Sequence, residues 1–130
     1  MAMVYAALTG ATDKDPAAMA AFATERGYAG PDGTAWLFMT EGAAALGLNA
    51  TEVPADEQSI RQAIISGRPI ICSMGPGDFT TTGHFIVITD IDQNSKLIVH
   101  DPNSAERSAT SWEFDTILKQ CRAMWSYSLA

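Results

Sequence analysis

His84 and Asp101 are the residues of this sequence whose types and positions best suit acid–base chemistry. His84 stands where a glycine- and hydroxyl-rich loop gives way to an apolar run, and Asp101 ends the next apolar run, just before a proline. Histidine exchanges protons near neutral pH, and a carboxylate can orient the imidazole and stabilise its charged form. The pair could supply two members of a nucleophilic triad, which would still need its nucleophile.

The distance between His84 and Asp101 depends on how their two strands pair. A two-residue turn, with Ile91 opposite Lys96, would place Asp101 diagonal to His84 on one face of the hairpin. Diagonal neighbours lie roughly 7–8 Å apart at the backbone, which is within side-chain reach. An odd loop length would put the two residues on opposite faces. Because side chains alternate along a strand, His100 points away from that face, so Asp101 is the expected partner.

Other interpretations of the same residues stay open at this point. A histidine beside a glycine and an aspartate before a proline are also ordinary turn chemistry, with roles in packing alone. A metal site made of His84, His100 and Asp101 conflicts with the strand alternation, which separates the two histidines. The loop Gly75–Asp78 lacks the Lys and Ser/Thr of a phosphate-binding loop and opens no helix. We therefore expect neither a metal nor a cofactor.

The elements that must position this pair follow an order of helices first and strands afterwards. Apolar residues recur at helical spacing in the first half, with N-caps expected at Asp15, Thr34 and Asp56. Short β-branched runs bounded by turn residues follow Gly67. This order predicts an α+β domain in which N-terminal helices pack on an antiparallel sheet. The expected helices are 1–8, 15–27, 34–47, 56–67 and 110–118, and the expected strands are 48–53, 69–74, 85–91, 96–101 and 122–129.

Composition narrows the function classes. The 130 residues are 47% hydrophobic and 18% charged, which is typical of one soluble domain with a real core. The net charge is −7 and the basic residues are scattered, which argues against nucleic acid and against anionic membrane surfaces as partners. No apolar run is long enough to span a membrane, so no membrane insertion is expected. The localisation stays unknown, and it would be extracellular or cell-surface if a signal peptide lies upstream of Met1.

The two cysteines offer little chemistry of their own. Cys72 and Cys121 lack metal-ligand spacing and are too few for a disulfide framework. Cys72 lies in an apolar strand and Cys121 beside an expected helix end. Both are interpreted as buried packing thiols.

Six short segments occur in one order along the chain. The most specific are Gly83-His84-Phe-Ile-Val87 and Asp101-Pro102-Asn103-Ser104. The others are Gly10 after an Ala/Met/Val-rich helix, Gly33-Thr-Ala-Trp36, Gly67-Arg-Pro69 and Met74-Gly-Pro-Gly-Asp-Phe79. In this order, over the whole chain, they resemble the C-thirty-nine-like cysteine peptidases, a papain-like group named after bacteriocin-leader peptidases. The resemblance implies a papain-like fold, hydrolysis of peptide bonds in a peptide or protein substrate, His84 as the general base and Asp101 as its orienting carboxylate.

The same resemblance draws attention to a missing nucleophile. The family nucleophile lies in a Cys-Gly-Pro-Thr-type motif at the start of a helix, a few residues after an oxyanion-hole Gln, and the segment Met1–Tyr5 matches the helix just after that motif. Neither that Cys nor that Gln is in the sequence. We therefore expect a single peptidase-like domain over residues 1–130, truncated before the nucleophile and inactive as it stands. An incomplete first helix would also expose apolar surface and favour self-association.

Two alternatives to a truncated peptidase remain. The chain could be a degenerate relative that keeps the cleft and binds peptides without cutting them. It could also be a plain structural or interaction domain, in which His84 and Asp101 are packing and turn residues. Cys72 is a poor substitute for the nucleophile, because it belongs to a strand and lacks a helix terminus to stabilise a thiolate.

Overall fold

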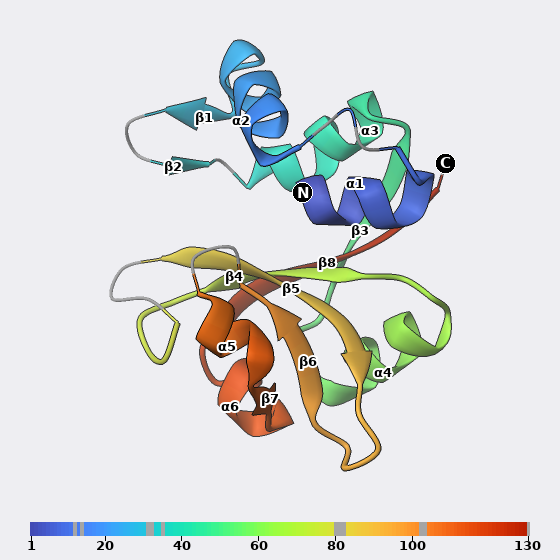
Figure 1. The fold of residues 1–130 in the computed structure, drawn as a ribbon, viewed down its shortest axis with the longest axis vertical. Coiled ribbons are helices and arrows are strands. Elements are labelled where there is room, and N and C mark those ends of the chain that lie inside the picture. Colours follow the sequence, from blue (N-terminus) through green and yellow to red (C-terminus); the bar gives the residue numbers. More distant parts are fainter. Residues whose placement is uncertain are drawn as a thin grey trace. The chain divides into compact units, whose positions relative to one another are not determined.

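The structure is a computed structural model that describes residues 1–11, 13, 15–30, 33–34, 36–79, 83–101 and 104–129. The chain divides into two units (Figure 1). The first contains Met1–Thr51 and Tyr127–Ala130, and the second contains Glu52–Ser126. Within the described part of the chain, none of the helices is both long and apolar enough to cross a membrane.

The first unit is mainly helical. Helix α1 ends at Gly10, whose φ of 73° lies in the left-handed region that glycine adopts at little cost. Helix α2 begins after Asp15, whose carboxylate accepts a hydrogen bond from the Ala18 amide at 2.8 Å. Both features agree with the sequence-based prediction. The elements are α1 (Ala2–Thr9), α2 (Pro16–Glu25), β1 (Ala29–Gly30), β2 (Gly33–Thr34), the π-helical turn η1 (Phe38–Gly42) and α3 (Ala43–Ala45).

The prediction that Thr34 caps a helix is wrong. Thr34 lies opposite Ala29, and Gly33 lies opposite Gly30, in the small antiparallel pair of β1 and β2. The N-cap position of the helical segment is occupied by Leu37, three residues after Thr34. The helical segment starts instead at Phe38.

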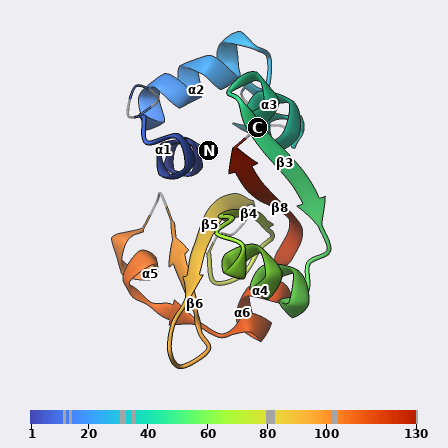
Figure 2. The same ribbon diagram turned by 90° about the vertical axis from the view of Figure 1, so that its right-hand side faces the viewer.

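The described residues of the sheet form six strands in the order β3-β8-β4-β5-β6-β7. Every strand pair whose register is described is antiparallel, which confirms the predicted α+β class. Its strands are β3 (Leu48–Val53), β4 (Ile70–Met74), β5 (His84–Ile91), β6 (Leu97–His100), β7 (Ser111–Trp112) and β8 (Cys121–Leu129). The helices of the second unit are α4 (Glu57–Ile65), α5 (Ala105–Ala109) and α6 (Phe114–Leu118). Helix α5 lies beside β6, as both Figure 1 and Figure 2 show.

The core of the second unit lies on one face of this sheet. Alternate residues of β4 and β5 pack there against residues of α4 and α6, and complete burial of an aliphatic side chain contributes about 1.5–3 kcal/mol. Met74 belongs to this core and lies opposite His84 in the register. His84 therefore lies at the end of the core-facing side of β5, next to the buried residues Ile86 and Ile88. The fully buried members from the two strands are Ile70, Cys72, Met74, Ile86 and Ile88.

The segment after β6 differs from the prediction. The sequence predicts a helix over 110–118 that starts at a capping box from Thr110 to Glu113, but Ser111 and Trp112 form β7 and pair with β6. Helix α6 begins only at Phe114, after Glu113. The backbone hydrogen bonds that β7 makes with β6 compete with a helix start at Thr110. The residues before it form the short helix α5, which was not predicted and which contributes to the site described below.

Candidate active site

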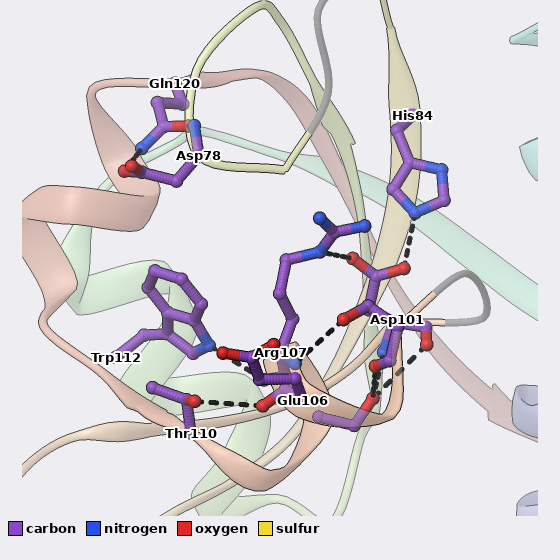
Figure 3. A network of polar contacts seen from close by, with 10 residues as sticks. Asp78, His84, Asp101, Glu106, Arg107, Thr110, Trp112 and Gln120 are labelled. Carbon is purple, nitrogen blue, oxygen red and sulfur yellow. Dashed lines mark hydrogen bonds and ion pairs between the residues drawn. The ribbon is translucent and has the colours of Figure 1, made fainter.

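His84 and Asp101 meet at the boundary of the core. The Nε2 atom of His84 lies 2.7 Å from Oδ1 of Asp101 (Figure 3). The side chain of Asp101 has no exposed surface, and that of His84 is 12% exposed. Water therefore cannot compete for the carboxylate, and a hydrogen bond that involves an ionised group is stronger in such an environment.

The hairpin that joins β5 to β6 does not have the expected two-residue turn. The Asp92 amide donates to the Lys96 carbonyl at 2.8 Å, so the loop between them has three residues. Ser95 closes the loop with φ at 59°, in the left-handed region that three-residue hairpin loops use. Ile91 therefore lies opposite Leu97 instead of Lys96. With no further irregularity, this odd loop would have sent His84 and Asp101 to opposite faces.

A β-bulge restores the shared face. The register shifts between Ile88 and Asp90, which makes Thr89 an extra residue on β5. One extra residue reverses the alternation of side chains beyond it. Past the bulge the pairing is the one the sequence argument assumed, so Asp101 is again diagonal to His84. The turn was predicted wrongly, and a compensating bulge gives the predicted neighbours.

His100 takes no part in the contact with Asp101. Its Nε2 atom lies 3.0 Å from Oγ1 of Thr89, the bulge residue. Among the residues that the structure describes, no group of three or more His, Cys, Asp or Glu side chains could hold a metal ion.

Arg107 is a member of this site that the sequence analysis missed. Its Nε atom donates to Oδ2 of Asp101 at 2.6 Å, so the carboxylate lies between the imidazole and the guanidinium (Figure 3). Arg107 comes from α5, which is capped by Ser104. A serine three residues after Asp101 is a helix-start signal, and it could have suggested the short helix that carries the arginine.

Gln120 holds the loop after β4 by two hydrogen bonds to Asp78. Its Oε1 accepts from the Asp78 amide at 2.7 Å, and its Nε2 donates to Oδ2 of Asp78 at 2.8 Å (Figure 3). A Cβ atom on Gly77 would lie 2.2 Å from Oε1 of Gln120, so this close approach requires glycine. Phe79 then stacks on Trp112 with ring centroids 4.5 Å apart. The described part of this loop is thus held by protein side chains.

The family follows from the sequence, and a solved structure supports the fold. The sequence matches the Peptidase_C39 like family over residues 1–128. The chain belongs to this family. It is also similar to the crystal structure of the peptidase domain of Streptococcus ComA, a bi-functional ABC transporter involved in a quorum-sensing pathway. The TM-score is 0.55, with 22% sequence identity, over 78% of this chain and 69% of that chain. Among curated proteins, none matches the chain.

Membership of the Peptidase_C39 like family confirms the resemblance, and at 22% identity the ComA structure supports the α+β peptidase fold alone. Cysteine peptidases use a thiolate, and this family member has two thiols, Cys72 and Cys121. Cys72 is completely buried, and its pKa is raised by the hydrogen bond to Cys121 and by desolvation. The prediction that Cys121 is also buried is wrong, because that side chain is partly exposed.

The position of Cys121 nevertheless separates it from His84. Cys121 lies opposite Met74 on one side, and Met74 lies opposite His84 on the other. Two strand spacings separate the two backbones by about 10 Å, and the strand between them contributes the fully buried Met74. The Cys121 thiol donates instead to the carbonyl oxygen of Ala123 at 3.2 Å. Neither thiol of this chain is suited to exchange a proton with His84.

A cavity elsewhere in the second unit does not include the pair. It has a volume of about 430 Å³ and is lined by residues between 53 and 68 and by Ser126. Its lining contains neither a histidine nor a carboxylate, so the geometry for acid–base chemistry is found at His84 and Asp101.

Proposed function

We propose that this chain is a cysteine peptidase domain that hydrolyses peptide bonds, with His84 as the general base and Asp101 as the carboxylate that orients it. The observation that carries the proposal is the 2.7 Å contact between His84 Nε2 and the buried Asp101 carboxylate. The same pair in a chain outside a peptidase family could be structural. Membership of the Peptidase_C39 like family favours the catalytic role.

The contact assigns different roles to the two imidazole nitrogens. A carboxylate accepts the Nε2 proton, so the neutral imidazole carries its lone pair on Nδ1. In the proposed reaction Nδ1 takes the proton of a cysteine thiol, and the thiolate attacks the substrate carbonyl carbon. The imidazolium then gives that proton to the leaving amine, and water hydrolyses the acyl-enzyme in the second half of the reaction.

The thiol in this proposal comes from outside residues 1–130. Cys72 is buried with a raised pKa, and Cys121 is separated from His84 by a strand. The family resemblance suggests a Cys-Gly-Pro-Thr-type motif before α1, with the oxyanion-hole Gln a few residues earlier. Residues 1–130 alone are then expected to cleave no peptide bond. Because Met3 of α1 is 40% exposed, self-association through this helix is part of the same proposal.

A second candidate is a degenerate family member that binds peptides without cutting them. The observation that favours it is the position of the two thiols, because Cys72 is buried and Cys121 lies two strands away from His84. In that case the carboxylate–imidazole pair would serve to hold the β5–β6 hairpin and α5 together.

One experiment separates the two candidates. The chain is extended before α1, either with its natural codons or with a grafted Gln and Cys-Gly-Pro-Thr segment of matching length. The rate of alkylation of the new thiol is then measured against pH, together with hydrolysis of a peptide mixture. A functional triad gives a thiolate at lower pH than an isolated cysteine, because the helix N-terminus and the imidazolium stabilise it.

The matched controls are the two histidine variants. His84→Ala should move the alkylation profile to higher pH and abolish hydrolysis. His100→Ala, on the residue that contacts Thr89, should change neither. An extended protein whose alkylation profile is the same with and without His84 would mean that thiol and imidazole never meet, and the peptidase proposal would be wrong.

A further inference from the structure

We propose that Arg107 is a positioning residue of this site, which holds the Asp101 carboxylate so that Oδ1 keeps the proton of His84 on Nε2. This inference rests on the proposed function, because the tautomer with the proton on Nε2 leaves Nδ1 as the base for the thiol. Arg107 itself acts through Asp101 and needs no contact with substrate.

His84 and Arg107 contact different oxygens of the Asp101 carboxylate. His84 Nε2 lies 2.7 Å from Oδ1, and Arg107 Nε lies 2.6 Å from Oδ2. The carboxylate has no exposed surface, so its orientation is set by protein groups and not by water. A carboxylate held on one oxygen only can rotate about its Cβ–Cγ bond. The second bond to a planar guanidinium prevents that rotation.

The backbone of Arg107 is itself fixed at both of its polar groups. Its amide donates to Oγ of Ser104 at 3.0 Å, and its carbonyl oxygen accepts from Nε1 of Trp112 at 3.0 Å (Figure 3). The preceding turn is closed as well, because the Asp101 amide donates to Oγ of Ser108 at 2.8 Å. The arginine and the aspartate are thereby joined through one short helix as well as through their side chains.

The side chain of Arg107 also contacts an aromatic ring. Its guanidinium carbon lies 6.0 Å from the centre of the Phe79 ring. Phe79 is 3% exposed and stacks on Trp112, and the Asp78–Gln120 bonds hold its loop. An arginine whose only task was to neutralise Asp101 would not need this support, since a mobile cation would suffice. The arrangement is that expected of a group that must keep one orientation.

The test is nitrogen-15 and proton NMR of the two imidazoles in the chain of 130 residues, comparing Arg107→Gln and Arg107→Lys with the unaltered protein. Two readouts are taken for His84: the nitrogen that carries the proton in the neutral ring, and the solvent-exchange rate of the Nε2 proton. His100 serves as the internal reference. Arg61→Gln is the matched control, because Arg61 also pairs with a carboxylate, at 2.9 Å from Glu57, and also stacks on a ring, at 4.6 Å from Phe114.

In Arg107→Gln the Nε2 proton of His84 should exchange about tenfold faster or more, since the carboxylate that accepts it loses its bond to the guanidinium. Arg107→Lys keeps the charge without the planar geometry. The exchange rate of the His84 Nε2 proton in this variant should lie between those of Arg107→Gln and the unaltered protein. Arg61→Gln and the His100 signals should be unchanged. An exchange rate in Arg107→Gln equal to that of the unaltered protein would overturn the proposal, and so would an equal acceleration in Arg61→Gln.

If Arg107→Gln does not fold, Arg107→Lys decides. An unchanged exchange rate in that variant would show that charge alone is needed and would overturn the positioning role. The measurement requires no nucleophile, so its outcome is separate from that of the alkylation experiment. Failure of alkylation with the expected NMR result rejects the peptidase and keeps the positioning role. The reverse pattern rejects Arg107 alone.

Discussion

Asp101→Asn changes one oxygen of the central carboxylate into an amide nitrogen and tests the site directly. Arginine has only donors, so Arg107 must face the amide oxygen of the new Asn side chain. The amide nitrogen, also a donor, then faces His84 Nε2, which must become an acceptor. In the neutral imidazole the proton should therefore move to Nδ1, the nitrogen that would have to accept the thiol proton in the proposed reaction.

The same substitution should cost stability. Asp101 makes two hydrogen bonds that involve ionised groups, at 2.7 and 2.6 Å, with no exposed surface. Bonds of this kind contribute about 1.5–3 kcal/mol each and neutral ones about 0.5–1.5. Replacing the charged carboxylate by a neutral amide should therefore lower the free energy of unfolding by about 2 kcal/mol.

Two assays follow these effects in the chain of 130 residues. Nitrogen-15 NMR shows which imidazole nitrogen is protonated, and denaturant unfolding gives the loss of stability. Asp78→Asn is the matched control, because Asp78 faces the neutral amide of Gln120 and should leave the His84 tautomer unchanged. An Asp101→Asn protein whose neutral His84 still carries its proton on Nε2 would refute the reasoning, as would a stability equal to that of the unaltered protein.

Three further predictions concern the loop after β4 and the titration and reactivity of buried groups. Gly77→Ala places a Cβ 2.2 Å from Oε1 of Gln120, and should lower the free energy of unfolding by about 1–3 kcal/mol. Gly83→Ala should lower the free energy of unfolding less, because the described heavy atom nearest to its new Cβ is 3.9 Å away. Denaturant unfolding measures both variants, and an equal loss in the two would contradict the close contact between Gly77 and Gln120. Burial raises the pKa of Tyr127, and the pKa of Cys72 is raised too, so the unfolded chain loses these protons first. The contribution of these two groups to the free energy of unfolding should be constant below pH about 9 and should fall as the pH rises further. Tyr127→Phe should make this fall less steep. If the dependence on pH were the same in that variant, Tyr127 would not be one of the groups responsible. Thiol reagents should leave Cys72 unmodified in the native protein at neutral pH. Mass spectrometry after labelling measures this, and a modified Cys72 would contradict the prediction.

Local signals in the sequence predicted many of the elements. Asp15 and Asp56 begin helices because each carboxylate accepts the backbone amide three residues later, at 2.8 and 2.7 Å. Such contacts are complete within one turn and depend little on the rest of the chain. Gly10 ends a helix for a similarly local reason, since its φ is positive. The strands were identified by their β-branched composition and by the turn residues around them, which also require no knowledge of partners.

The contact between His84 and Asp101 was predicted correctly, although the turn that joins their strands was not. The three-residue loop at Ser95 moved the register by one, and the bulge at Thr89 moved it back. Each irregularity depends on how two whole strands twist and pack on the core, so neither can be read from the loop sequence alone. The neighbours His84 and Asp101 were recovered because this register places Val99 of β6 opposite Ile88 of β5, and both residues belong to the core.

Tertiary structure alone decided the position of Arg107 and the fate of the segment that follows it. The capping box at 110–113 favours a helix start locally, but Ser111 and Trp112 form backbone hydrogen bonds with β6 instead. Because of this pairing, α5 ends at Ala109. That short helix brings Arg107 to the carboxylate of Asp101. The sequence thus determined which side chains could do the chemistry, since residue type and strand alternation are local properties. The contact of Arg107 with this carboxylate was decided by a competition between helix and strand, which is settled only when a neighbouring strand is present.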